Sequence, residues 1–198
     1  MTGSLTVRPA TGDELRAVLP DLARLRQTVF RAFPYLYEGS AEYEERYLAT
    51  YLNAPGALVV LARDGQRVVG ASTALPLTAE TPEVQAPFRP PEFDRSDVLY
   101  LGESVLLPEY RGRGIGHRFF DEREAHARRL GLGVTIFCAV QRPENHPACP
   151  EGYRPLNAFW EARGYTERPD LATTMGWQDV GEGEETAKPM RFWVRRLG

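Results

Sequence analysis

SVLLPEYRGRGIGHRFF, residues 104–120, runs from a strand-like stretch into a helix-like stretch, and residues 111–116 between them hold three glycines and two arginines. Glycine at the start of a helix costs conformational entropy, so this bare backbone needs a reason. A helix N-terminus has unpaired amides and a partial positive charge, which attract anions. Arg111 and Arg113 can add charge-assisted hydrogen bonds. The segment is therefore predicted to cradle a pyrophosphate group.

The spacing of the glycines argues against two other phosphate cradles. A Walker motif needs Gly-Lys-Ser/Thr, whereas His117 and Arg118 follow the last glycine, Gly116. A dinucleotide fingerprint needs G-x-G-x-x-G, whereas this segment reads G-x-G-x-G. A nucleotide-binding protein thus remains only as a weaker alternative. A glycine-rich helix entry with surface arginines and no ligand is the structural alternative.

Strand-like and helix-like runs alternate on either side of this segment. Residues 57–63 and 66–75 flank Asp64-Gly65, which favours a hairpin with a two-residue turn. Further strands are expected at 5–9, 98–107, 133–141, 171–178 and 190–196, and helices at 15–29, from Ser40, at 115–130 and at 156–163. Pro20 is expected to kink or restart the first helix. The hairpin implies a mixed sheet, and the absence of repeats and linkers implies a single domain over residues 1–198.

Composition and charge exclude several classes of protein. A chain of 198 residues with 42% hydrophobic content can bury one core. The net charge of −3 supplies no basic field for nucleic acid or an anionic membrane. No apolar run is long enough for a membrane span and no signal peptide is evident, so a cytoplasmic protein is expected. Cys138, Cys149 and His146 fit no common zinc spacing, so no metal site is expected.

The same residues resemble the acyl-CoA-binding motif of the GNAT superfamily of N-acetyltransferases, R/Q-x-x-G-x-G/A after a strand. Arg111, Gly114 and Gly116 fill its fixed positions, and Pro108 and Tyr110 stand where members often carry them. The resemblance implies an α/β (α+β), acyl-CoA N-acyltransferase-like fold. This fold has a mixed, strongly twisted central sheet of about seven strands flanked by about four helices, with a V-shaped opening between the central strands.

The resemblance also implies the activity and the donor site. The chain is expected to transfer an acetyl group from acetyl-CoA to a primary amine of a small molecule or protein, and dimers are common in the superfamily. The strand backbone at Ser104, Val105 and Leu106 would pair with pantetheine. The pyrophosphate would be held by Arg111, Gly112, Arg113, Gly114, Ile115, Gly116 and His117.

Glu103 is the candidate general base. Strand alternation puts it on one face with Leu99, Leu101, Val105 and Leu107. A carboxylate on an otherwise apolar face is desolvated, which raises its pKa and makes it a better base. Members of the superfamily often place a basic residue or a water-binding carboxylate on this strand. The alternative is an inert, hydrogen-bonded glutamate at a strand irregularity near Gly102.

The acid for the leaving thiolate departs from the superfamily pattern. Many relatives carry N-x-x-A-x-x-x-Y-x-x-x-G-F, and alignment on Gly164 puts Trp160 in the tyrosine slot. An indole N–H donates a hydrogen bond but is no practical proton donor. Tyr153, Tyr165 or water could supply the proton instead, and Trp160 could equally be core packing.

Acceptor recognition has weaker signals. Phe33, Tyr35 and Tyr37 lie between the first two helices, a region that walls the acceptor pocket in relatives. Aromatic walls suit a hydrophobic or cationic ligand, although helix packing would also account for them. The proline-rich stretch 76–97 is long for a compact domain and suggests a lid, a binding loop or a partner contact. Together with Trp160, it motivates an alternative function, a non-catalytic acyl-CoA sensor or assembly module.

Overall fold

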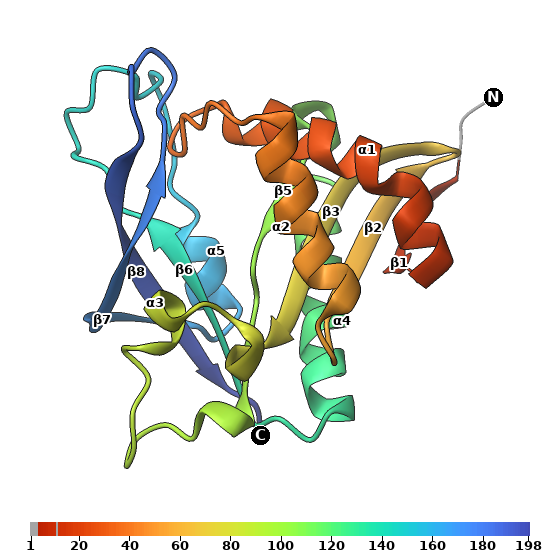
Figure 1. Cartoon of the computed structure of the whole chain (residues 1–198), viewed down its shortest axis with the longest axis vertical. Helices are drawn as coiled ribbons and strands as arrows, with labels where there is room; N and C mark the ends of the chain where they lie inside the picture. Colours follow the sequence, from red (N-terminus) through yellow and green to blue (C-terminus); the bar gives the residue numbers. More distant parts are fainter. Residues whose placement is uncertain (1–3, 11) are drawn as a thin grey trace.

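The protein folds around one mixed sheet of eight strands (Figure 1). The computed structural model describes residues 4–10 and 12–198, apart from the side chains of residues 41, 45, 46 and 50. The strand order is β1-β2-β3-β4-β6-β8-β7, and β5 pairs with β3. The strands are β1 Leu5–Pro9, β2 Leu58–Asp64, β3 Arg67–Pro76, β4 Val98–Tyr100, β5 Ser104–Leu106, β6 Val134–Val140, β7 Thr166–Trp177 and β8 Thr186–Arg196. Since β4 and β6 are parallel and the other pairs antiparallel, the predicted mixed sheet is confirmed.

Helices cover both faces of the sheet (Figure 1). α1 Gly12–Phe30 and α2 Ala41–Asn53 pack on one face, and α4 Ile115–Arg129 packs on the other. α3 Pro82–Gln85 and α5 Asn157–Ala162 are short. Pro20 does not restart the helix, because α1 runs through this proline as one element. Pro20 lies on the exposed side, while Leu15, Val18 and Leu22 bury the opposite side and hold the helix on the sheet.

The predicted hairpin is confirmed, with its turn one residue later than expected. Asp64 still pairs with Arg67, so the two turn residues are Gly65 and Gln66. Gly65 has φ of +58°, a conformation that favours glycine in a tight hairpin turn.

The stretch predicted as one strand over 98–107 divides into two. The amide of Leu101 donates to the carbonyl of Ile136 (2.7 Å), which continues the pairing with β6 by one residue beyond β4. Beyond an irregular turn at residues 101–103, β5 pairs with β3 alone among the described strands. The sheet therefore opens between β5 and β6, which accounts for the additional strand and matches the expected V-shaped opening.

The proline-rich segment 76–97 is packed into the protein's own core. Leu77, Val84, Phe88 and Phe93 are almost completely buried. Phe88 meets the ring of Phe192 on β8 edge to face, at 4.8 Å between centroids. The segment therefore covers the β7–β8 end of the sheet and is part of the core, regardless of what binds to its exposed side.

No helix in the described part of the chain combines the length and apolar character needed to cross a membrane.

Removing the Phe88 ring tests whether this segment belongs to the cooperative core. We expect Phe88→Ala to lower the free energy of unfolding by about 3–5 kcal/mol, the usual cost of deleting a buried aromatic ring. Urea unfolding measures it. Glu92→Gln is the control, since it only weakens the exposed ion pair with Arg168 in the same segment and should cost less than about 1 kcal/mol. A loss below about 1 kcal/mol for Phe88→Ala would contradict the assignment.

Candidate active site

The N-terminus of α4 presents backbone amides for which the described residues provide no acceptor. Gly112 and Gly114 have φ of +73° and +76°. A Cβ at either position would have no described atom within 4 Å, so the positive φ, and not crowding by the protein, explains the glycines. No side chain caps the helix at Gly114, and its carbonyl accepts from the Arg118 amide (3.3 Å). The amides from Gly112 to His117 are thus available to an anion.

The side chains around this loop leave those amides open. Ile115 is 1% exposed and anchors the helix start in the core, so only its backbone can serve a ligand. Arg113 donates to the carbonyl of Glu109 (2.9 Å), and the side chain of Arg111 is exposed, while its backbone amide donates to the carbonyl of Pro108 (3.1 Å). His117 is exposed and meets the ring of Phe159 at 4.8 Å. A cradle of amides flanked by exposed arginines suits a pyrophosphate.

β5 offers a free backbone edge next to this cradle. The Leu107 amide donates to the backbone carbonyl of Val69 (3.0 Å), and the Thr73 amide donates to the backbone carbonyl of Glu103 (3.1 Å). Because bonded and non-bonded pairs alternate in an antiparallel ladder, the N–H and C=O groups of Ser104 and Leu106 point away from β3. They face the opening toward β6, whereas the side chain of Val105 is buried. An extended ligand carrying amides can pair with this edge, so the residues fit pantetheine.

The predicted environment of Glu103 is wrong. Leu99 and Leu101 belong to the core under α4, whereas Val105 belongs to the core under α1 and α2. The irregularity at residues 101–103 shifts the alternation, so Glu103 projects toward α1 and α2, away from Leu99 and Leu101. The sequence left two interpretations of Glu103, a general base or a hydrogen-bonded glutamate at a strand irregularity. The structure contains the irregularity near Gly102.

Glu103 lies in a buried ionic cluster. Its carboxylate pairs with the guanidinium of Arg26 on α1, and the same guanidinium pairs with Glu44 on α2. The side chain of Glu44 is 0% exposed and that of Glu103 is 6% exposed. The Arg26 guanidinium also lies 3.8 Å from the ring centroid of Tyr47. One guanidinium thus serves two carboxylates, of which Glu103 alone retains access to solvent.

Arg26 and Glu44 were missed in the sequence, although a signal was present. Arg26 follows Leu22 at i+4, within the apolar stripe of α1. Glu44 precedes Leu48 at i+4, on the buried side of α2. A charged residue in an apolar stripe at helical spacing predicts a buried ion pair.

The two candidate acids occupy different environments. Tyr165 is 2% exposed and lies in the core under α4, where its hydroxyl meets Thr135 (2.9 Å) and Glu124 (3.2 Å). Burial and the charge of Glu124 raise its pKa. The structure therefore does not bring Tyr165 together with Glu103. Tyr153 is exposed, and its ring meets Phe33 at 4.7 Å.

Trp160 is partly buried and packs against the core under α4. Its ring lies 5.0 Å from Phe137 and 5.1 Å from Trp193. This contact explains an indole in the slot that holds tyrosine in many relatives.

Phe33, Tyr35 and Tyr37 lie in the α1–α2 loop, which the rest of the protein holds in place. Phe33 contacts the loop after β6 through Tyr153. Tyr35 is half-buried, and burial raises its pKa. Tyr37 pairs with Asp179 through an isolated β-bridge. All three thus border the loops beyond β6 and β7.

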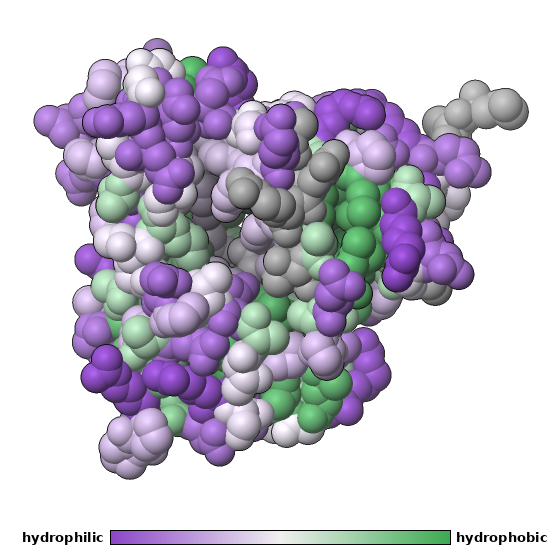
Figure 2. All heavy atoms as spheres, in the orientation of Figure 1, coloured by the Kyte–Doolittle hydropathy of each residue, from purple (hydrophilic) through white to green (hydrophobic). Residues whose placement is uncertain are grey.

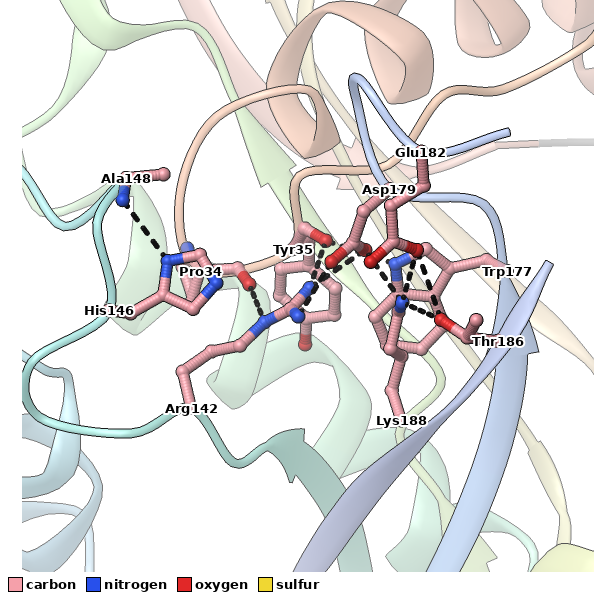
Figure 3. Close-up of polar contacts among 10 residues, drawn as sticks. All are labelled: Pro34, Tyr35, Arg142, His146, Ala148, Trp177, Asp179, Glu182, Thr186 and Lys188. Carbon is pink, nitrogen blue, oxygen red and sulfur yellow. Dashed lines mark hydrogen bonds and ion pairs between the residues drawn. The ribbon is translucent and has the colours of Figure 1, made fainter. Parts of the chain in front are cut away.

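Arg142, just after β6, is the hub of these contacts (Figure 3). Its Nε donates to the carbonyl of Pro34 (2.7 Å), and its Nη2 donates to the carbonyl of Tyr35 (2.7 Å). Its Nη1 and Nη2 donate to the carboxylate of Asp179 at 2.7 and 2.9 Å. One side chain therefore joins the α1–α2 loop, the end of β6 and the β7–β8 connection. No local pattern in the sequence predicts these contacts of Arg142, because its partners are far apart along the chain.

These elements surround a hollow on one face of the molecule. Figure 2 shows this face depressed between the α2 side and the β6–β8 side. In the described part of the chain, no group of three or more His, Cys, Asp or Glu side chains could hold a metal ion.

The comparisons with known proteins agree with this geometry. The sequence model of the Acetyltransferase (GNAT) family matches residues 22–165, which include β5, the glycine loop and α4. Among curated proteins, no sequence matches the chain significantly.

Solved structures with the same fold cover almost the whole chain. The ribosomal-protein-alanine N-acetyltransferase of Brucella melitensis is 20% identical, with a TM-score of 0.62 over 97% of this chain and 99% of that one. The yncA protein of Salmonella typhimurium, solved with its cofactor acetyl-CoA, is 15% identical, with a TM-score of 0.63 over 98% and 94%. A GCN5-related N-acetyltransferase from Kribbella flavida is 19% identical, with a TM-score of 0.58 over 98% of each chain.

A matched pair of glycine variants tests the cradle. Gly114 begins α4 and Gly131 follows its end, with φ of +76° and +74° and no described atom within 4 Å of an added Cβ. Alanine at either should cost about 1–2 kcal/mol of stability, because it must adopt a left-handed conformation. Only Gly114→Ala should also weaken acetyl-CoA binding, by about tenfold or more in calorimetry. Equal affinities of the two variants would show that the cradle is not the donor site.

Proposed function

The chain belongs to the GNAT acetyltransferase family, and from that premise we propose that it is an acetyl-CoA-dependent N-acetyltransferase acting on a primary amine of a small molecule or protein. One observation carries the proposal: the open amides of α4 and the free edge of β5 adjoin the same opening in the sheet, with Glu103 beside it. Few other ligands need both an anion cradle and an extended amide-pairing edge.

The donor would be held mainly by backbone groups. The amides from Gly112 to His117 bind the pyrophosphate, with Arg111 and Arg113 adding positive charge. Ser104 and Leu106 pair with the pantetheine amides. Acetyl-CoA then supplies the thioester that is transferred. A backbone site of this kind fixes the donor in one direction through the sheet, with its acyl end toward the α1–α2 face.

The acceptor side needs a group that takes a proton from the amine. An amine at neutral pH arrives as an ammonium ion and must lose a proton before its nitrogen attacks the thioester carbonyl. The C–N bond then forms and the C–S bond breaks. Glu103 is the carboxylate proposed for this role, because it alone of the pair bound to Arg26 reaches solvent.

The departing thiolate needs a proton in return. Trp160 is packed against Phe137 and Trp193, and an indole does not release its proton. We propose Tyr153 or solvent for this role, because Tyr153 is exposed next to Phe33. Tyr165 is not proposed as the acid, because its hydroxyl is hydrogen-bonded to Thr135 and Glu124 in the core under α4.

A non-catalytic acyl-CoA sensor is the second candidate. The observation that favours it is Trp160, because a structural indole stands where many relatives carry an acid. A sensor would keep the donor cradle and have no need for Glu103.

Substitution of Glu103 distinguishes the two candidates. We expect wild-type protein to release CoA thiol from acetyl-CoA in the presence of one class of amine in a panel of amines, amino acids and peptides. Glu103→Gln should lower kcat/KM by about 10²- to 10⁴-fold, because it removes the proposed base. Its affinity for acetyl-CoA should stay unchanged in calorimetry.

Glu92→Gln is the control for this substitution. Glu92 is an exposed carboxylate that also pairs with an arginine, so its variant should match wild type in turnover. Acetyl-CoA binding without thiol release for any acceptor would favour the sensor. Failure to bind acetyl-CoA would reject both candidates.

A further inference from the structure

Arg123 on α4 is a buried cation to which the steps above assign no role. The residue is 1% exposed, and its guanidinium lies 4.6 Å from the ring centroid of Phe120. Its Nε donates to the carbonyl of Phe119 (3.2 Å), one turn earlier on the same helix. Burial lowers the pKa of Arg123 to about 10, so the group still carries its charge at neutral pH. α4 therefore holds a charged guanidinium in a fixed place against the sheet.

The other hydrogen bonds of this guanidinium go to main-chain carbonyls at the point where the sheet opens. Its Nη1 donates to the carbonyl of Glu103 (3.1 Å) and lies 3.5 Å from the carbonyl of Thr73. The Glu103 carbonyl also accepts from the Thr73 amide (3.1 Å), and the Thr73 carbonyl also accepts from the Gly102 amide (3.1 Å). Arg123 thus joins α4 both to β3 and to the irregular turn at residues 101–103.

Glu103 is consequently held from both faces of the sheet. Its amide donates to the hydroxyl of Thr73 (3.2 Å), and its carbonyl accepts from the Thr73 amide and from Arg123. Its carboxylate pairs with Arg26 on α1, which lies on the face opposite α4 (Figure 1). One arginine therefore fixes the main chain of Glu103, and another fixes its side chain.

Stability alone does not account for an arginine at this position. Nη2 of Arg123 is buried and has no hydrogen-bond partner among the described residues. The neighbouring carboxylate on α4, Glu124, pairs with Arg163 and Arg195. A buried cation that bonds to neutral carbonyls and leaves one donor unused lowers the stability of the fold. An apolar side chain of similar length would fill the same space without that cost.

We propose that Arg123, together with Thr73, is a positioning residue for Glu103. This inference rests on the proposed N-acetyltransferase function and adds the residues that aim the base of the same site. The bonds to the main chain of Glu103 set where the chain leaves β6 and where the carboxylate enters the α1–α2 side. Misplacing a reacting group by about 1 Å lowers turnover by up to about 10²-fold. The glycine loop takes no part in these bonds, so acetyl-CoA binding is independent of Arg123.

Arg123→Met tests this role through the kinetics of CoA-thiol release from acetyl-CoA. The variant should fold, because the carbonyls of Thr73 and Glu103 both keep a main-chain donor. Its kcat should fall about 10- to 100-fold, since the base is no longer held in place, whereas KM for acetyl-CoA and the calorimetric Kd should stay unchanged. An unchanged kcat in the folded variant would overturn the proposal.

A double-mutant cycle with Glu103→Gln separates positioning from a general structural effect. Because Arg123 acts through Glu103, adding Arg123→Met to Glu103→Gln should lower kcat by less than about twofold further. An equal fall in both backgrounds would show that Arg123 does not act through Glu103 and would overturn the proposal.

Arg95→Met is the matched control. Arg95 lies in the segment 76–97, and its Nε donates to a main-chain carbonyl, that of Phe88 (2.7 Å), at the β7–β8 end of the sheet. This variant also removes an arginine that bonds to the backbone, but one that does not contact Glu103. Its kcat and KM should match those of wild type.

Thr73→Val provides a second variant in case Arg123→Met does not fold. It removes the hydroxyl that accepts from the Glu103 amide, so kcat should again fall about tenfold or more. Thr73→Ser keeps this hydroxyl and should match wild type. An unchanged kcat for folded Thr73→Val would then overturn the proposal.

The wild-type protein distinguishes failure of this inference from failure of the proposed function. Turnover by wild type with an unchanged kcat for Arg123→Met would reject only the positioning role. No turnover by wild type with any amine in the panel would reject the enzyme, and the positioning role with it.

Discussion

The departure of β5 from β6 at residues 101–103 is the constraint on which the rest of the site depends. Up to Leu101 the chain still bonds to Ile136 on β6, and from Ser104 it pairs only with β3 among the described strands. This separation leaves backbone groups of β5 unpaired in the middle of a sheet, where pairing is otherwise complete. The same irregularity turns Glu103 from the α4 side to the α1–α2 side. A free edge and a reachable carboxylate are thus two consequences of one change in backbone direction.

Features with a local cause could be predicted from the sequence. The glycine loop is an example, because positive φ at Gly112 and Gly114 depends on the residue itself. The hairpin is another, although pairing of Asp64 with Arg67 moved its turn by one residue. The face of Glu103 was predicted wrongly. Side chains alternate between the two faces of a regular strand, and this alternation shifts wherever one residue leaves the pleat. Gly102 marks that point: a Cβ there would collide with the hydroxyl of Tyr51 on α2.

The contacts on the acceptor side could not be predicted in the same way, because their partners are distant in the sequence. Arg142, after β6, joins Pro34 and Tyr35 in the α1–α2 loop to Asp179 in the β7–β8 connection. Only the fold brings them together. Arg26 is an intermediate case, since its position in an apolar stripe signals a buried partner but not which one. Glu44, four residues before buried Leu48, carries the same local signal on α2, whereas the pairing of the two residues depends on the fold.

The donor and acceptor halves of the proposed site therefore differ in how they are built. The donor half consists mostly of main-chain groups, so its geometry survives extensive side-chain change. This is one way in which the same fold can persist in solved structures that are only 15–20% identical to this chain. The acceptor half consists of side chains from α1, α2 and three loops, held by ion pairs such as that of Arg142 with Asp179. Each substitution there changes charge or shape directly, so specificity can diverge while the donor half stays fixed.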